Sequence, residues 1–215
     1  VGWALAIAAI AYALRQTRGQ LGGKQIPLMG VLAAFIFAAQ SINVPVGGGT
    51  SGHLLGGVLA AIILGPWAAV LIMASVVGVQ AILFQDGGIT ARGFNIVNMG
   101  VIGTWGGYAI YSALRSICGV NRRGTLIAAF LASWLSVLAA ATVFCIEFWL
   151  SHRGQGYDFS RVFGWMVFLH CLIGIGEGLI TAMVLGFVLV QRPDLLQATT
   201  TPSPTVLSGV GRFTF

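Results

Sequence analysis

The sequence carries very little charge. Asp, Glu, Lys and Arg together make up 7% of its 215 residues, whereas hydrophobic residues make up 57%. Water cannot be the main solvent for a fold of this composition, so the chain is predicted to be an integral membrane protein. The net charge of +6 does not indicate a nucleic-acid partner, because the basic residues are sparse and lie at the ends of apolar runs.

Cysteine is also scarce, with only Cys118, Cys145 and Cys171. An odd number of widely spaced cysteines argues against a disulfide framework and favours single buried thiols. The chain lacks a G-x-x-x-x-G-K-[ST] loop, so it is not predicted to hydrolyse ATP. It also lacks G-x-S-x-G and H-E-x-x-H motifs, which leaves a membrane hydrolase using Ser51 and His53 with little support.

What the sequence does contain is a series of apolar segments. A spanning helix needs about 20 residues, with a range of about 17–25, and two of the segments, Val1–Leu14 and His53–Leu64, are shorter than this range. The first of these follows no basic leader region, so we expect residues to be missing upstream of Val1. The expected spans are Val1–Leu14, Gln25–Ile42, His53–Leu64, Trp67–Phe84, Asn95–Leu114, Thr125–Leu150 and Val162–Val190.

The positive charges favour one topology. With seven spans and the N-terminus outside, eight of the eleven Lys and Arg residues are cytoplasmic: three in loop 15–24, three in loop 115–124, and Arg192 and Arg212. If His53–Leu64 does not cross, the two basic loops fall on opposite sides, against the positive-inside rule. The predicted fold is therefore all-α and polytopic, with about seven transmembrane helices. A membrane domain covers residues 1–196, and residues 197–215 form a flexible polar tail or linker.

A glycine-rich stretch, Asn43–Gly57 (NVPVGGGTSGHLLGG), separates two of the apolar segments. Its six glycines let the backbone turn tightly and approach a ligand, and its one titratable side chain is His53. His53 is a candidate metal ligand. The alternative is that the stretch only joins two helices, with the histidine at the headgroup level. The topology predicts that this loop folds into the outer half of the membrane, buried in protein or lining a cavity.

Polar residues inside the other spans need a reason, because a charge there costs about 2.5–3.5 kcal/mol on insertion scales. Glu177 lies in the middle of the last span, and His170 lies two turns earlier on the same helix face. They indicate either a proton or metal path, or a buried carboxylate hydrogen-bonded to a neighbouring helix. Glu147 is expected to be solvated or paired. Other candidates for orienting a ligand or lining a cavity are Gln40, Thr50, Ser51, Gln80, Asn95 and Asn98.

Four segments carry a family resemblance, in this order: GGGTSGHLLGG, ILGPWAAVLIM, ILFQDGGITARGFNIVNMG and LIGIGEGLITA. They closely resemble the CbiM/NikM family, the nickel- or cobalt-capturing S components of energy-coupling factor transporters. The resemblance implies a prokaryotic cytoplasmic membrane protein that captures one divalent ion near the outer face. A separate transmembrane coupling protein and a pair of cytoplasmic ATPases would drive its release inward. The resemblance also allows a small accessory membrane subunit as a further partner.

The resemblance also implies a set of nitrogen ligands. They are the N-terminal amine, the amide and imidazole of a second-position histidine, and the histidine of the glycine-rich loop. Only the last maps onto this chain, as His53, because Val1 and Gly2 stand where Met-His is expected. Nitrogen ligation suits Ni²⁺ or Co²⁺, with nickel favoured; calcium or magnesium would need several carboxylates. No organic cofactor is expected.

In the mechanism that we expect, bound metal orders the glycine-rich loop and changes how the chain docks on the coupling protein. Gly103, Gly106 and Gly107 form a candidate docking face, since small residues allow close helix contact in lipid. The alternative hypothesis is a stand-alone proton-coupled ion carrier or channel that uses His170 and Glu177.

Overall fold

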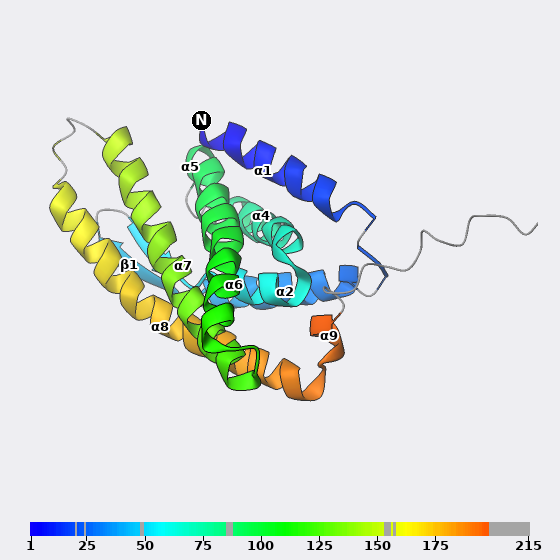
Figure 1. Cartoon of the computed structure of the whole chain (residues 1–215). Helices are drawn as coiled ribbons and strands as arrows, with labels where there is room; N and C mark the ends of the chain where they lie inside the picture. Colours follow the sequence, from blue (N-terminus) through cyan, green and yellow to red (C-terminus); the bar gives the residue numbers. More distant parts are fainter. Residues whose placement is uncertain are drawn as a thin grey trace, which may run out of the picture.

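The computed structural model of the chain describes residues 1–19, 21–23, 25–47, 50–84, 88–152, 156 and 158–197. Most of these residues are helical, with one antiparallel hairpin after the second helix (Figure 1). The elements are α1 (Gly2–Thr17), α2 (Gln25–Gln40), β1 (Asn43–Gly47), β2 (Thr50–His53), α3 (Gly57–Leu64), α4 (Pro66–Leu83), α5 (Gly88–Asn95), the π-helix η1 (Ile96–Gly106), α6 (Gly107–Cys118), α7 (Arg122–Ser151), α8 (Phe159–Gln191) and α9 (Asp194–Gln197).

Within the described residues, three helices are long and apolar enough to cross a membrane: α4, α7 and α8. The apolar helix α2 has 16 residues, fewer than the roughly 20 of a full span. The mostly helical membrane fold is therefore confirmed, and the count of seven spans stays a prediction. The predicted tail of residues 197–215 lies outside the described residues, apart from the backbone of Gln197 at the end of α9.

The glycine-rich stretch departs from the all-α expectation. It forms the β1–β2 hairpin, in which Asn43 pairs with His53 and Val44 pairs with Gly52. Alternating Val44 and Val46 suit an extended strand, and Pro45 is tolerated because a two-stranded ribbon leaves each strand an open edge. Both strands contact α8, so the hairpin rests on the helix that carries Glu177.

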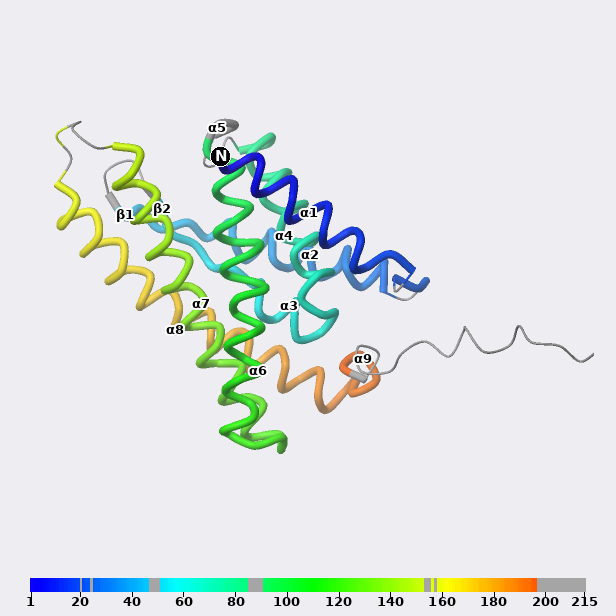
Figure 2. Tube along the Cα trace, turned by 45° about the horizontal axis from the view of Figure 1, so that its top comes forward, coloured from blue at the N-terminus to red at the C-terminus, as the bar shows by residue number. Residues whose placement is uncertain are grey.

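The segment predicted to be a span at His53–Leu64 begins its helix later, at Gly57. Gly56 has φ of +74°, a left-handed conformation that glycine adopts without penalty and that separates the strand from the helix. All eight residues of α3 are buried. Figure 2 shows α3 in the middle of the molecule, where it contacts α2, α4 and α6. This short apolar helix forms part of the protein core.

The span predicted at Asn95–Leu114 is instead a composite. Helix α5 leads into the π-helix η1 and then into α6, with αR backbone at both junctions. Thr104 Oγ1 donates a hydrogen bond to the carbonyl of Met99, five residues earlier, at 2.7 Å. The π-helix is rare and occurs mostly as single-turn bulges, often at functional sites, so a stretch of 11 residues is unusual.

Two of the three glycines expected on a docking face, Gly103 and Gly107, pack inside the chain, whereas Gly106 is half-buried and stays a candidate. A Cβ on Gly103 would lie 2.8 Å from Leu55, and one on Gly107 would lie 2.5 Å from Val58. Both glycines are buried, because they allow η1 and α6 to pack closely on the start of α3. Their small size is therefore used inside the chain.

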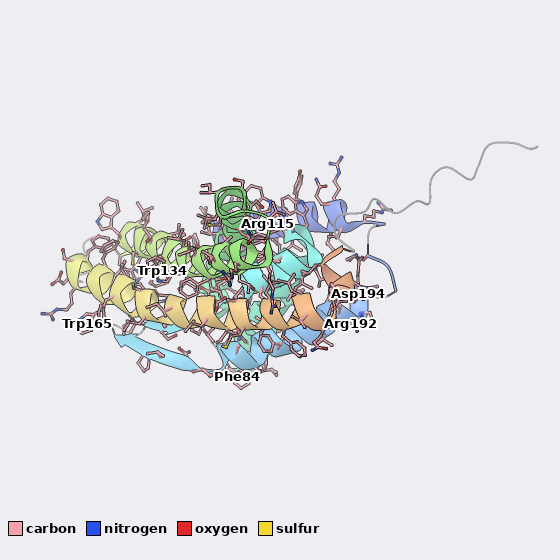
Figure 3. All side chains as sticks on the ribbon, turned by 60° about the horizontal axis from the view of Figure 1, so that its bottom comes forward. Phe84, Arg115, Trp134, Trp165, Arg192 and Asp194 are labelled. Carbon is pink, nitrogen blue, oxygen red and sulfur yellow. The ribbon has the colours of Figure 1, made fainter. Side chains whose placement is uncertain are left out.

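Among the described elements, helices α7 and α8 form the most extensive contact. Gly174 and Gly178 of α8 lie against Trp134 and Phe130 of α7, where an added Cβ would come within 2.6 and 2.7 Å of the aromatic rings. The opposite face of α8 is apolar and exposed, as expected for contact with lipid. Figure 3 shows Trp165 near one end of α8 and the Arg192–Asp194 ion pair, 3.0 Å long, near the other.

Candidate metal-binding cavity

A cavity of about 460 Å³ lies between the hairpin and the helices α5, η1, α7 and α8. Among the described residues, its wall contains all three histidines of the chain, His53, His152 and His170, and one carboxylate, Glu147. The other polar residues on its wall are Ser51, Asn95, Asn98 and Ser151. The rest of the described wall is mostly apolar, with Met99, Val137 and Met166 among its residues. A few polar groups converging on a mostly apolar cavity is the usual form of a small-ligand site.

His53 stands at the end of β2, half-buried on the cavity wall. Its Nδ1 lies 2.8 Å from the carbonyl oxygen of Leu54. A carbonyl can only accept a hydrogen bond, so Nδ1 carries the proton and Nε2 of the neutral ring keeps its lone pair. Metal-binding histidines are oriented in the same way, by donating their other ring N–H to a backbone carbonyl.

The segment after His53 is held by the carboxylate of Glu177. Its Oε2 accepts a hydrogen bond from the N–H of Leu55 at 2.9 Å, and its Oε1 accepts one from the N–H of Gly56 at 2.7 Å. Glu177 is only 3% exposed. A buried carboxylate is costly unless its oxygens are satisfied, and here each oxygen binds one backbone donor.

Gln40, at the end of α2, holds the same segment from the other side. Its Nε2 donates a hydrogen bond to the carbonyl oxygen of Leu55 at 2.7 Å. Both backbone polar groups of Leu55 are thus bound to buried side chains, one from α2 and one from α8. This fixes the backbone two residues after His53 and limits how far its imidazole can move.

On the opposite wall, Asn98 of η1 donates a hydrogen bond from Nδ2 to Oε2 of Glu147 at 2.7 Å. The expectation that Glu147 is paired is thus met by a side chain of the π-helix. Within the described part of the chain, Oδ1 of Asn98 is buried and has no hydrogen-bond partner. A buried acceptor of this kind beside a cavity can take a hydrogen bond from a water molecule or a hydrated ion.

The remaining candidates differ in where their side chains lie. Ser51 and Asn95 line the cavity, as does His170. Gln80 is buried in α4 and is absent from the described cavity wall. Thr50 lies in β2, but its side chain is outside the described ones. The sequence interpretation missed His152, whose position at the end of a long helix gave no signal that it lines the cavity.

Over residues 1–19, 50–84, 88–152 and 158–197, where all three histidines lie, no group of three or more His, Cys, Asp or Glu side chains converges closely enough to hold a metal ion. The described side chains therefore offer His53 as a ligand without a complete coordination sphere around it.

The geometry defines a class: a helical membrane protein with a histidine-lined cavity beside a fixed backbone loop. The chain also matches, over residues 1–195, the model of the family described as "CbiM: Cobalt uptake substrate-specific transmembrane region". This match covers most of its length, and the chain belongs to the CbiM family.

Individual relatives agree with this assignment. A putative fused nickel transport protein NikMN of Archaeoglobus fulgidus is 40% identical over 204 residues, which are 95% of this chain and 66% of that protein. A putative metal transport protein of Haloquadratum walsbyi is 39% identical, over 90% of this chain and 86% of the relative. The crystal structure of a truncated transition metal transporter superposes with a TM-score of 0.77 at 32% identity, over 88% of this chain and 92% of the other.

Proposed function

We propose that this chain captures a divalent transition metal ion, with nickel favoured over cobalt, and that Nε2 of His53 is a ligand. The observation that carries the proposal is the held loop: His53 faces a cavity in a ligand-ready tautomer, and Glu177 and Gln40 fix the backbone that follows it. The first relative's name refers to nickel, which supports that choice of ion. Metal is the cargo of this protein.

The cavity opens at the outer end in the proposed topology. Ser151 and His152, on its wall, lie at the connection between α7 and α8. Arg192 lies at the opposite end of α8 from Trp165 (Figure 3), and Arg115 lies in the last turn of α6, just before the connection to the start of α7. By the positive-inside rule, the end with Arg115 and Arg192 is cytoplasmic. We therefore place the chain in the cytoplasmic membrane of a prokaryote, with α1, α2, α3 plus its hairpin, α4, η1 with α6, α7 and α8 as the seven crossings.

The other ligands are proposed to come from a Met-His segment preceding Val1. The start of α1 packs on α5, where a Cβ on Gly2 would lie 2.8 Å from the ring of Phe94. Phe94 is part of the cavity wall. A preceding segment would therefore join the chain close to the cavity wall, and its amine, amide and imidazole nitrogens would complete a nitrogen site of the kind that Ni²⁺ prefers.

Transport into the cell is proposed to need partners. No nucleotide-binding loop is present in this sequence, so ATP would be hydrolysed on a separate pair of ATPases connected through a transmembrane coupling protein. The chain spans 66% of the length of the fused relative. A small accessory membrane subunit, fused or separate, is therefore part of the proposal.

The alternative of a stand-alone proton-coupled carrier is less well supported by the geometry. Both oxygens of Glu177 accept hydrogen bonds from backbone N–H groups, and Glu177 is not on the described cavity wall. A carboxylate bound in this way favours a positioning role over a proton relay.

An uptake assay tests the proposal. Cells expressing the full-length protein with its coupling protein and ATPases should accumulate ⁶³Ni²⁺, and His53→Ala should abolish uptake while the variant still inserts into the membrane. ATP-dependent uptake at the wild-type rate by His53→Ala would refute it. Uptake by this chain alone, driven by a proton gradient, would support the stand-alone carrier.

A further inference from the structure

The second histidine on the cavity wall, His170, has the same ligand-ready arrangement as His53. Its Nδ1 lies 2.8 Å from the carbonyl oxygen of Met166, one turn earlier on α8. As at His53, this bond requires a proton on Nδ1 and leaves the lone pair of Nε2 for a metal ion. Two imidazoles from different elements therefore offer the same atom to the same cavity.

His170 also lies directly beside the strand that carries His53. A Cβ on Gly52, the residue before His53, would lie 2.9 Å from Cε1 and 3.1 Å from Nε2 of His170. Only glycine leaves room for the ring at this position, so Gly52 allows the imidazole to approach the β2 backbone. The ring is half-buried and forms part of the cavity wall, where an ion in the cavity can reach it.

The order of the side chains along the cavity gives His170 a place in a sequence of events. His152 and Ser151 lie at the end of α7, which is the proposed outer rim. His170 lies 11 residues beyond the start of α8 at Phe159, roughly 16 Å along the helix axis, and Glu177 lies two turns further. An ion that moves inward along α8 therefore passes His170 at the level of β2.

We propose that Nε2 of His170 is a transient nitrogen ligand, which accepts the incoming divalent metal ion and transfers it to His53. The inference rests on the proposed function, because it assumes that His53 is the final ligand. A bare or partly dehydrated ion is costly in an apolar cavity, and an intermediate nitrogen ligand lowers the barrier between water and the final site. The transfer involves exchange of one metal–nitrogen bond for another, with no change of oxidation state.

A transient ligand has a kinetic signature that neither a permanent ligand nor a structural residue shares. Removing it raises the barrier in both directions and leaves the two end states unchanged. His170→Gln should therefore slow Ni²⁺ association and dissociation by the same factor, about tenfold or more, with an unchanged Kd. The rates are measured by stopped-flow tryptophan fluorescence on the full-length protein, with Cys171→Ala, the next residue on α8 and outside the described cavity wall, as the matched control.

Each other result overturns the inference. A higher Kd caused by faster dissociation alone would show that His170 is a permanent ligand or a structural residue. Unchanged rates would show that His170 takes no part in nickel binding. If His53→Ala binds Ni²⁺ like wild type, the proposed function fails. If His53→Ala loses tight binding while His170→Gln behaves like wild type, only the transient ligand fails.

A second measurement does not depend on how well His170→Gln folds. In His53→Ala with ¹⁵N-labelled histidine, an ion can still reach the transient ligand but cannot move on. Paramagnetic Ni²⁺ should then broaden the Nε2 resonance of His170 at lower metal concentration than that of His152. Broadening of His152 alone, or of neither ring, would contradict the inference.

Discussion

Glu177 and Leu55 are 122 residues apart in the sequence and are joined by a 2.9 Å hydrogen bond from the Leu55 N–H to Oε2 of the carboxylate. The second oxygen of Glu177 binds the N–H of Gly56. Helix α8 therefore holds the backbone between the hairpin and α3, immediately after the proposed metal ligand. The first prediction follows from the need for two acceptor oxygens.

Glu177→Gln should weaken nickel binding. Glutamine has one acceptor oxygen and an NH₂ group that would face a backbone N–H, so one buried donor loses its partner. Such a loss costs about 1–3 kcal/mol, and we expect Kd to rise by about tenfold through a less well-positioned His53. Isothermal titration measures Kd, with Thr181→Val, a buried site one turn further along α8, as the control. Wild-type affinity in Glu177→Gln would show that the bonds do not position the ligand.

Gln40 and Glu177 should act as one unit. They bind the carbonyl and the N–H of the same residue, Leu55, so removing one lets the backbone move away from the other. In a double-mutant cycle of Gln40→Ala and Glu177→Gln, the effects on nickel affinity should be non-additive by about 0.5 kcal/mol or more. Strict additivity would indicate that the two side chains stabilise separate parts of the fold.

Gly52→Ala should disturb the cavity where β2 packs against α8. The new methyl group would lie 2.8 Å from Cδ1 of Ile173 and 2.9 Å from Cε1 of His170, and the His170 ring is held by its bond to Met166. Either the hairpin or α8 must shift, at a cost of about 1–3 kcal/mol. We expect a lower thermal unfolding temperature and weaker nickel binding. Gly30→Ala, where nothing lies within 4 Å of the added Cβ, is the control.

Two glycines of α8 should respond to alanine in opposite ways. A Cβ on Gly178 would lie 2.8 Å from the carbonyl oxygen of Phe130, whereas a Cβ on Gly176 meets nothing within 4 Å. Gly178→Ala should separate α7 from α8 and destabilise the fold by about 1–3 kcal/mol. Gly176→Ala should be neutral or stabilising, because alanine favours helix. Thermal unfolding in detergent measures both, and equal effects would contradict the close α7–α8 contact.

Much of the fold was accessible from the sequence, because long apolar segments and their basic flanks are local signals. Examples are the start of α4 at Pro66, within one residue of the predicted Trp67, and the mid-helix position of Glu177. The β1–β2 hairpin and the π-helix were not predicted. The first depends on α8 as a surface to pack against, and the second depends on contacts of Gly103 and Thr104 that no local pattern reveals.

The sequence also predicted only part of the candidate site. His53 could be identified by its glycine-rich surroundings and by family resemblance. The buried carboxylate of Glu177 could be recognised as important, but its partners, Leu55 and Gly56, are distant in sequence. Gly107 was assigned to a partner surface, whereas it packs on Val58 and Ser136, because small-residue patterns do not show which face meets which neighbour.

The central claim is that the imidazole of His53 holds the captured ion. Isothermal titration of nickel into the full-length protein and into His53→Ala tests it most directly, with unchanged thermal unfolding of the metal-free proteins as the control for folding. We predict a single tight site in the wild type and a loss of at least about 100-fold in affinity in the variant, equivalent to about 2.7 kcal/mol. Nickel binding to His53→Ala with wild-type affinity and stoichiometry would contradict the account.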